Sequence, residues 1–327
     1  MTSAAEPAGA GPVDEALRVR PAPALRPYVA WYSGYRQRGV DPAVHHGLPS
    51  PHLTLILTLD EPLHLAGHPD PAQPPGSYRT LLGGLHTSPA LITHDGCQSG
   101  VQVALGPLGA RALLGLPAGE LAGWDFPADE VLGRCAAEGQ ERLRAAADWP
   151  GRFAAVDRWL TERLAAHLSG RASAARPPAP EVVQAWRLLL AGAGRPGAPT
   201  VAALADEVGW SGRHLAARFR SEIGLTPKAA ARVIRFDRAR RLLTARAAAA
   251  GGGSAGGVGS AGLAELAADC GYFDQAHLAR EFRALAGSPP SRWLAQEGGR
   301  AGAAARPGSE TSKPGGGGDA QAGGVPG

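Results

Sequence analysis

The chain has few cysteines and no long apolar run. Three cysteines occur among 327 residues, and none belongs to a CxxC pair. This argues against a structural zinc site and against a disulfide framework. No run of about 20 apolar residues is present, so we expect no membrane span. The N-terminal segment MTSAAEPAGAGP lacks the apolar centre of a signal peptide, and we therefore expect a soluble, cytoplasmic protein.

Lysine is also scarce, and arginine carries nearly all the positive charge. Only Lys228 and Lys313 are lysines, and alanine, glycine and proline are abundant. This composition indicates a GC-rich genome more than a selected function. The net charge is +4 and the pI is near 9.2. Residues 201–297 hold 13 Lys and Arg against 9 Asp and Glu, so the C-terminal third is mildly basic, in agreement with a polyanionic partner.

An internal repeat occupies the last third of the chain. LADEVGWSGRHLAARFRSEIGLTP (204–227) matches LAADCGYFDQAHLAREFRALAGSPP (266–290) at its glycine, aromatic, His-Leu, phenylalanine and proline positions. The second copy has one extra residue, confined to a turn, and both flanks stay in register. The repeat therefore predicts two small helical units of one design.

Each copy has the sequence form of a helix-turn-helix. In the first copy, Thr200 is a suitable N-cap, Gly209 ends the first helix, and Ser211 caps the second helix. Leu215 and Phe219 are one turn apart and form its buried face. The second helix of such a pair enters the DNA major groove. The alternative is an ordinary helical hairpin with solvated surface arginines, which a second matching copy disfavours.

These strings resemble the AraC/XylS family of transcriptional regulators over about residues 180–297. The matching parts are LADEVGWSGRHLAARF, RVIRFDRARRLL and GYFDQAHLAREFRALAGSPPSRW. The resemblance implies two helix-turn-helix units joined by a long helix at about 228–246. In that helix the apolar side chains would face inward (Val233, Phe236, Leu242 and Leu243), and the arginines would lie nearer solvent or phosphate (Arg232, Arg235, Arg238 and Arg240).

The family's DNA contacts carry over by position. The base-facing residues would be Arg213, Ala216 and Ala217 in the first unit and Gln275, Ala276, Ala279 and Arg280 in the second. The residues that contact phosphate or fix position would be Ser211, Arg218, His277 and Arg283. Arginine pairs with guanine and glutamine with adenine, each discriminating by about 1–3 kcal/mol. A turn-stabilising role for His214 and His277 is an equally good interpretation.

The chain divides by composition and predicted periodicity. We expect α+β architecture: an N-terminal β-rich, barrel-like domain followed by helices, then an all-α domain with two helix-turn-helix units joined by a long helix. The predicted segments are a disordered 1–20, a domain at 21–170, a Pro-rich linker at 171–180, a DNA-binding domain at 181–297 and a disordered tail at 298–327. A glycine-rich insertion at 247–262 departs from the family pattern and is expected to be flexible.

The region 21–170 begins with strand-like runs and ends with helical ones. HLTLILTL (52–59) is the clearest strand, with its leucines on one face. LRPYVAWYSGYR and GPLGARALLGLPAGEL resemble the N-terminal domain of one AraC subgroup, which implies effector sensing or dimerisation. Four aromatic residues either line an apolar effector pocket or pack in the core (Trp31, Tyr32, Tyr35 and Trp124).

Enzyme and metal chemistry find little support in 21–170. Asp60, His64 and His68 are the best metal candidates, but Gly67 and Pro69 exclude helical spacing. No serine-hydrolase, zinc-protease or phosphate-loop signature is present. Cys97 is a candidate nucleophile without a matching histidine environment. We therefore predict no metal, no cofactor and no enzymatic activity.

The predicted function is sequence-specific regulation of transcription, responsive to an effector through the N-terminal domain. The alternative is an enzyme targeted to DNA, with a catalytic N-terminal domain. The expected partners are double-stranded promoter DNA, a small-molecule effector, and RNA polymerase if the protein is an activator. A homodimer through 21–170 is compatible with the sequence. The expected location is the cytoplasm, at the nucleoid.

Overall fold

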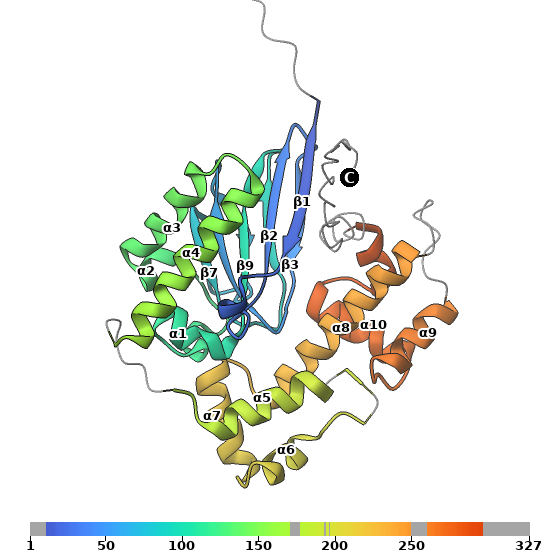
Figure 1. Ribbon diagram of the computed structural model, residues 1–327. Helices are drawn as coiled ribbons and strands as arrows, with labels where there is room; N and C mark the ends of the chain where they lie inside the picture. Colours follow the sequence, from blue (N-terminus) through green and yellow to red (C-terminus); the bar gives the residue numbers. More distant parts are fainter. Residues whose placement is uncertain (1–10, 171–176, 193, 196, 250–259, 297–327) are drawn as a thin grey trace, which may run out of the picture.

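The computed structural model describes residues 11–170, 177–192, 194–195, 197–249 and 260–296. An N-terminal domain of two antiparallel sheets and several helices is followed by an all-helical region (Figure 1). Two helix-turn-helix units joined by a long helix make up most of that region. The α+β architecture predicted from the sequence is confirmed.

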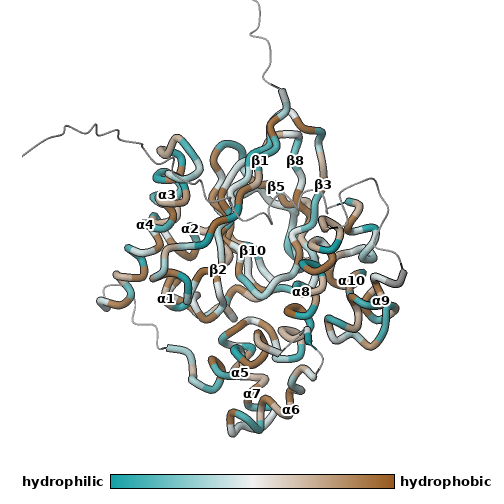
Figure 2. The backbone as a smooth tube through the Cα atoms, turned by 45° about the vertical axis from the view of Figure 1, so that its right-hand side comes forward, coloured by the Kyte–Doolittle hydropathy of each residue, from teal (hydrophilic) through white to brown (hydrophobic). Residues whose placement is uncertain are grey.

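Two sheets surround a common interior (Figure 2). The six-stranded sheet has the order β1-β2-β9-β4-β7-β10, with strands Val13–Val19, Val29–Arg38, Gln98–Leu105, Leu53–Thr58, Thr80–Gly83 and Asp125–Pro127. The four-stranded sheet has the order β3-β8-β5-β6, with strands Ala43–Gly47, Ala90–His94, Leu63–Gly67 and Gly76–Tyr78.

Successive side chains of β4 point to opposite faces of the larger sheet. The leucines at positions 53, 55 and 57 are fully buried beneath the helices, as the sequence predicts. Thr54 and Ile56 point to the opposite face and line the interior. The covering helices are α1 (Ala110–Leu114), α2 (Ala128–Leu132), α3 (Arg134–Ala145) and α4 (Trp149–Leu168), with short 3-10 turns η1 (Pro23–Leu25), η2 (Pro107–Gly109) and η3 (Ala118–Leu121).

The first strand corrects the prediction that residues 1–20 are disordered. β1 pairs with β2 along its whole length, from Val13 opposite Arg38 to Val19 opposite Tyr32. The Gly/Ala/Pro-rich composition ends at Pro12, so the composition that suggested disorder does not extend into VDEALRV, which forms the strand. Residues 1–10 lie outside the described part of the chain.

The helical region contains α5 (Pro180–Gly192), α6 (Val201–Glu207), α7 (Gly212–Ile223), α8 (Pro227–Ala249), α9 (Ser260–Asp269) and α10 (Gln275–Ala286). The predicted insertion at 247–262 is thus helical at both ends, because α8 extends to Ala249 and α9 begins at Ser260. Residues 250–259 lie outside the described residues, as do 171–176 of the predicted linker and the predicted tail. Helix α5 packs on the region as its leading helix, with Trp186 against Phe219 at 6.1 Å between ring centroids.

Three apolar clusters organise the interior. The main core runs from the outer face of the larger sheet through Trp159 of α4 to Phe219 of α7. The second helix-turn-helix unit has its own core with α8, built on Phe236, Phe282 and Trp293. The third, here called the cavity cluster, lies inside the β-domain and consists of Ile56, Leu63, Leu65, Tyr78, Leu81 and Ala90, with Ile92 against it. The first unit therefore shares a core with the N-terminal domain, whereas the core of the second unit has only the partly buried Leu48 of that domain packed against it among the described residues.

Candidate functional site

The two helix-turn-helix units repeat the same local geometry. Ser211 accepts a hydrogen bond from the His214 backbone N–H (3.3 Å), and Asp274 accepts one from the His277 N–H (2.6 Å). The glycine that ends each first helix has φ of 69° in one unit and 67° in the other, a conformation that favours glycine. These caps and turns confirm that the repeat encodes two units of one design.

Each turn is braced by a histidine against an aromatic ring. Trp210 contacts His214 with centroids 4.5 Å apart, and Tyr272 contacts His277 with centroids 5.3 Å apart. The backbone N–H of Phe273 also donates to His277 Nδ1 at 3.3 Å. These contacts support the interpretation that His214 and His277 stabilise the turns.

The predicted DNA contacts fall on the open side of α7 and α10. The exposed ones are Ser211, Arg213, Ala217, Arg218, Ala276, Arg280 and Arg283, and the half-buried ones are Ala216, Gln275, His277 and Ala279. The two acidic residues within these helices are held inward: Glu222 pairs with Arg111 and Glu281 with Arg232. Every exposed side chain of α7 and α10 that carries full charge is therefore an arginine.

The arginines of α8 correct one expectation. The four arginines named in the prediction (Arg232, Arg235, Arg238 and Arg240) do not lie free toward solvent or phosphate but are half-buried, whereas Arg241 is 63% exposed. Arg232 pairs with Glu281 at 2.7 Å, Arg235 lies 4.7 Å from the Tyr272 ring centroid, and Arg240 pairs with Asp237 at 2.6 Å. The spacing of Arg232, Arg235 and Arg240 places them on the sides of α8 that face the second unit and the β-domain. Their side chains are therefore used in packing within the protein.

The end of α7 is docked on the N-terminal domain. Arg111 of α1 donates two hydrogen bonds of 2.7 Å to Glu222, whose side chain is only 8% exposed. Gly119 of η3 approaches the same helix end so closely that a Cβ would lie 2.2 Å from the Ser221 carbonyl oxygen. The hydrogen bond to Glu222 also raises the pKa of Arg111. The first unit is thus fixed to the β-domain by charge and by close backbone contact.

A cavity of about 400 Å³ occupies the interior between the two sheets. Alternate residues of all six strands of the larger sheet line it, and the cavity cluster forms its apolar wall. Arg240 and Trp293, which belong to the helical region, complete the lining. A ligand in this space would therefore touch the N-terminal domain and the helical region together.

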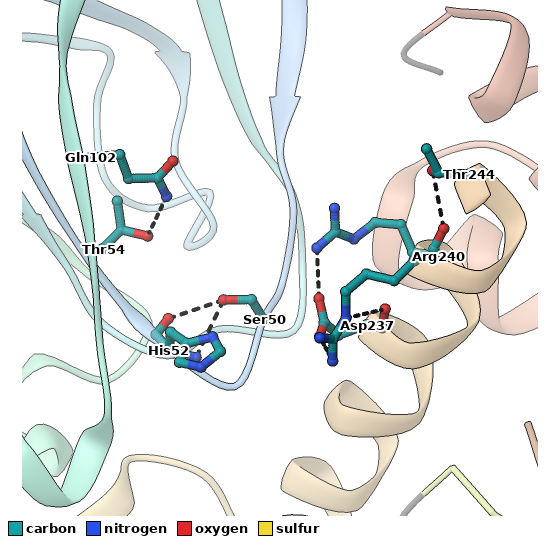
Figure 3. Close-up of polar contacts among 8 residues, drawn as sticks. Ser50, His52, Thr54, Gln102, Asp237, Arg240 and Thr244 are labelled. Carbon is teal, nitrogen blue, oxygen red and sulfur yellow. Dashed lines mark hydrogen bonds and ion pairs between the residues drawn. The ribbon is translucent and has the colours of Figure 1, made fainter. Parts of the chain in front are cut away.

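A polar junction lies beside the cavity on the side of α8. Asp237 and Arg240 extend from α8 toward the loop that carries Ser50 and His52, with Thr54 and Gln102 on the strands behind (Figure 3). Burial alone would raise the pKa of Asp237, but Arg240 and Arg241 hold it below its usual value. Burial lowers the pKa of His52 to about 4, so this imidazole is neutral at neutral pH.

Arg18 of β1 brings a further positive charge to this junction. Its guanidinium carbon lies 4.2 Å from the Trp31 ring centroid. Burial, followed by the positive charge of Arg240, lowers the pKa of Arg18. The nearby carboxylate of Asp237 is already paired with Arg240 and Arg241, at 2.6 and 2.8 Å.

The four predicted pocket aromatics divide between the two alternatives. Trp31 and Tyr35 line the cavity. Tyr32 is fully buried in the main core and donates a hydrogen bond of 2.8 Å to Asp157. Trp124 is 43% exposed and is not among the residues that line the cavity. Alternation along β2 explains the split, because residues 31 and 35 face inward and residue 32 faces the helices.

The metal and nucleophile candidates are not brought together. Asp60 contacts Arg38 and Ser99, His64 contacts Ser77, and His68 contacts Asp125. Within the described residues, no group of three His, Cys, Asp or Glu side chains could hold a metal ion. Cys97 is exposed on the surface.

Sequence reasoning did not find the residues of the junction and of the docked helix end. Arg111, Glu222, Arg18 and Asp237 are each surface-like by type, and their partners lie far away in the chain. The strand alternation that turns Arg18 inward, beside Asp14 and Ala16, was the one available signal.

Comparisons with known proteins give a family of unknown function and a partial structural likeness. A domain of unknown function (DUF6597) matches residues 17–127. No curated protein matches the chain. An apo variant of ToxT from Vibrio cholerae matches with a TM-score of 0.47 at 10% identity, covering 81% of this chain and 96% of that one.

Two further ToxT structures give similar values. One, from Vibrio cholerae, has a TM-score of 0.46 at 12% identity, covering 81% of this chain and 97% of that one. The other is ToxT of the same organism bound to an unsaturated fatty acid, with a TM-score of 0.47 at 9% identity, covering 89% of this chain and 98% of that one. In the part of this chain that the structure describes, no helix is long and apolar enough to span a bilayer. The fold of the described residues, taken from the structure itself, is a two-sheet β-domain joined to a pair of helix-turn-helix units.

Proposed function

We propose that this protein is a sequence-specific, DNA-binding regulator of transcription of the AraC type, and that a small molecule in the cavity modulates it. The observation that carries the proposal is the charge of the two second helices. Helices α7 and α10 each have an N-cap and an exposed side, and every exposed full charge within the two helices is an arginine, since their glutamates are tied inward. The N-cap of α10, Asp274, adds one exposed carboxylate. Two such helices can enter successive major grooves on one face of DNA.

The proposed residue roles are those that the AraC resemblance assigns by position. Arg213, Ala216 and Ala217 face bases from α7, and Gln275, Ala276, Ala279 and Arg280 face bases from α10. Phosphate contact and positioning fall to Ser211, Arg218, His277 and Arg283. Because α10 offers both an amide and an arginine, it reads bases more selectively than α7, whose alanines suit thymine methyl groups.

The cavity reaches the second unit through one residue. Trp293 lines the cavity and is 1% exposed within the core of the second unit. It contacts Phe282 of α10 with centroids 6.0 Å apart, and Phe282 contacts Phe236 of α8 at 5.0 Å. The first unit shares the main core of the N-terminal domain. A ligand that shifts Trp293 would therefore move the second unit relative to the first. The movement would change the affinity for DNA, and that change is a coupling free energy between ligand and DNA.

The test is DNA selection with the full-length protein at fixed salt. Arg280→Ala should weaken binding of the selected sequence by about 1–3 kcal/mol and relax preference at one base position. An equal loss on random DNA would make Arg280 a phosphate contact. Trp293→Phe should leave DNA binding in place but reduce its response to cavity ligands. Activation through RNA polymerase, dimerisation and a nucleoid location remain predictions of the resemblance.

A further inference from the structure

The cavity presents opposite charges from opposite edges of one sheet. Arg18 lines it from β1 and Asp125 lines it from β10, the two edge strands of the six-stranded sheet. Four strands lie between them, and neighbouring strands are about 4.8 Å apart. The two side chains therefore stand at separate ends of the cavity.

Positive charges gather at the end of β1 that carries Arg18. Arg18, Arg240 and Arg241 lie around the carboxylate of Asp237, which is paired with the latter two. The other acidic residues of β1 that line the cavity have partners of their own, because Asp14 accepts from Gln37 at 2.8 Å and Glu15 accepts from Trp149 at 2.9 Å. His52 adds no charge at neutral pH. Among the described residues we find no carboxylate paired with Arg18, and its Nε is buried without a hydrogen-bond partner. A partly buried, unpaired guanidinium costs free energy that an anionic ligand group would offset.

The Asp125 end offers a hydrogen-bond acceptor. Asp125 Oδ2 lies 2.8 Å from His68 Nδ1, and His68 Nε2 lies 3.2 Å from Tyr78 Oη. Tyr78 Oη also accepts a hydrogen bond from Gln73 at 3.4 Å. These contacts hold Oδ2 of Asp125 in place. Its Oδ1 has no partner among the described residues and lies over Gly83 at the cavity wall.

An apolar wall separates the two ends. Leu63, Leu65 and Leu81 belong to the cavity cluster and line the same space. These side chains offer no hydrogen bonds, so the middle of a ligand gains affinity only by burying apolar surface there.

We propose that the cavity binds a small molecule with two poles: an anionic group at Arg18, an apolar body against the cavity cluster, and a hydrogen-bond donor, ammonium or hydroxyl, at Asp125. This rests on the proposed function, in which the cavity is the effector site. Molecules with a carboxylate at both ends place one of them against Asp125 and bind less well. Molecules without an anionic group leave Arg18 unpaired.

The test measures binding of defined probes to the full-length protein by calorimetry. The probes are n-alkanoates from hexanoate to dodecanoate, the ω-amino acids of the same chains, and the matching dicarboxylates and alkylamines. The best ω-amino acid should bind about tenfold or more tightly than its alkanoate, since a charge-assisted hydrogen bond contributes about 1.5–3 kcal/mol. Equal affinity of the two would overturn the proposal, as would absence of binding by every probe.

Three variants test which residue binds which end of the ligand. Arg18→Gln should weaken the alkanoate and the ω-amino acid together, and Asp125→Asn should abolish the difference between them. Asp14→Asn is the matched control, because Asp14 lines the same cavity but is exposed and already accepts from Gln37 at 2.8 Å. Loss of the preference in Asp14→Asn in place of Asp125→Asn would refute the assignment. The comparison of probes on the unaltered protein stands even if a variant misfolds.

DNA selection on the same preparations separates this inference from the proposed function. Selection of a defined DNA sequence together with no probe binding would overturn the two-pole ligand and leave the regulator intact. Probe binding with the expected ranking but without any DNA selectivity would overturn the regulator and support the ligand site.

Discussion

Breaking the ion pair between Arg111 and Glu222 should loosen the first unit from the N-terminal domain. The pair has two hydrogen bonds of 2.7 Å, and the side chains are 23% and 8% exposed. Removing one partner of a fully buried pair costs about 3–5 kcal/mol. Because Arg111 keeps some access to water and glutamine retains one acceptor, Glu222→Gln should lower the free energy of unfolding by about 2 kcal/mol.

A double-mutant cycle measures the pair itself. Glu222→Gln, Arg111→Met and the double variant are compared by urea denaturation, with hydrogen exchange of α1 and α7 as a local probe in case unfolding has more than one step. We expect a coupling energy of about 1–2 kcal/mol. The control is the ion pair Arg142–Glu162, whose N–O distance is 2.6 Å and whose side chains are 43% and 59% exposed, and its coupling should be much weaker than that of the buried pair. Additive effects at Arg111 and Glu222, within about 0.3–0.5 kcal/mol, would refute the docking described here.

Three further predictions concern stability, pH and DNA. Gly119→Ala should destabilise the protein by about 1–3 kcal/mol, because its Cβ would meet the end of α7, whereas Gly212→Ala, with open space around its Cα, should be neutral or stabilising in the same melt. His52 has a folded pKa of about 4, below the unfolded value near 6.5, so its stabilising contribution is present above about pH 6.5 and is lost, by roughly 2–3 kcal/mol, as the pH falls toward 4. The difference between the wild type and His52→Gln, followed by urea melts across that range, isolates this effect; equal slopes for the two proteins would contradict it. Arg280→Ala should lose base preference at one position, measured by competition with single-base variants, and an unchanged preference would place Arg280 elsewhere.

The repeat units could be predicted in detail because their signals are local. Caps such as Ser211 and Asp274 act within one helical turn, and Leu215 and Phe219 follow helical spacing. The strand over 52–59 was equally clear, since its leucines alternate. Such features depend on nearest neighbours in the chain, and the structure confirms them.

The N-terminal edge and the contacts between distant segments were not predictable. β1 was not predicted because many of its residues are polar, whereas the aromatic, strand-like pattern of its partner β2 is clearer in the sequence. The junction of Arg18 with Asp237, and of Arg111 with Glu222, joins residues more than a hundred positions apart. Arginine and glutamate are surface residues by type, so only the three-dimensional arrangement shows that these are buried. The same holds for Trp293, whose place in the cavity wall depends on how α8 lies against the β-domain.

The measurement that tests the central claim most directly is selection of genomic DNA fragments by the purified full-length protein at fixed physiological salt. A variant with Arg213→Ala and Arg280→Ala serves as the matched control. The account predicts a shared sequence with two elements about one helical turn apart, bound by the wild type and lost in the variant. Binding that is salt-sensitive but without a shared sequence, or equal enrichment by the variant, would contradict specific regulation by these helices.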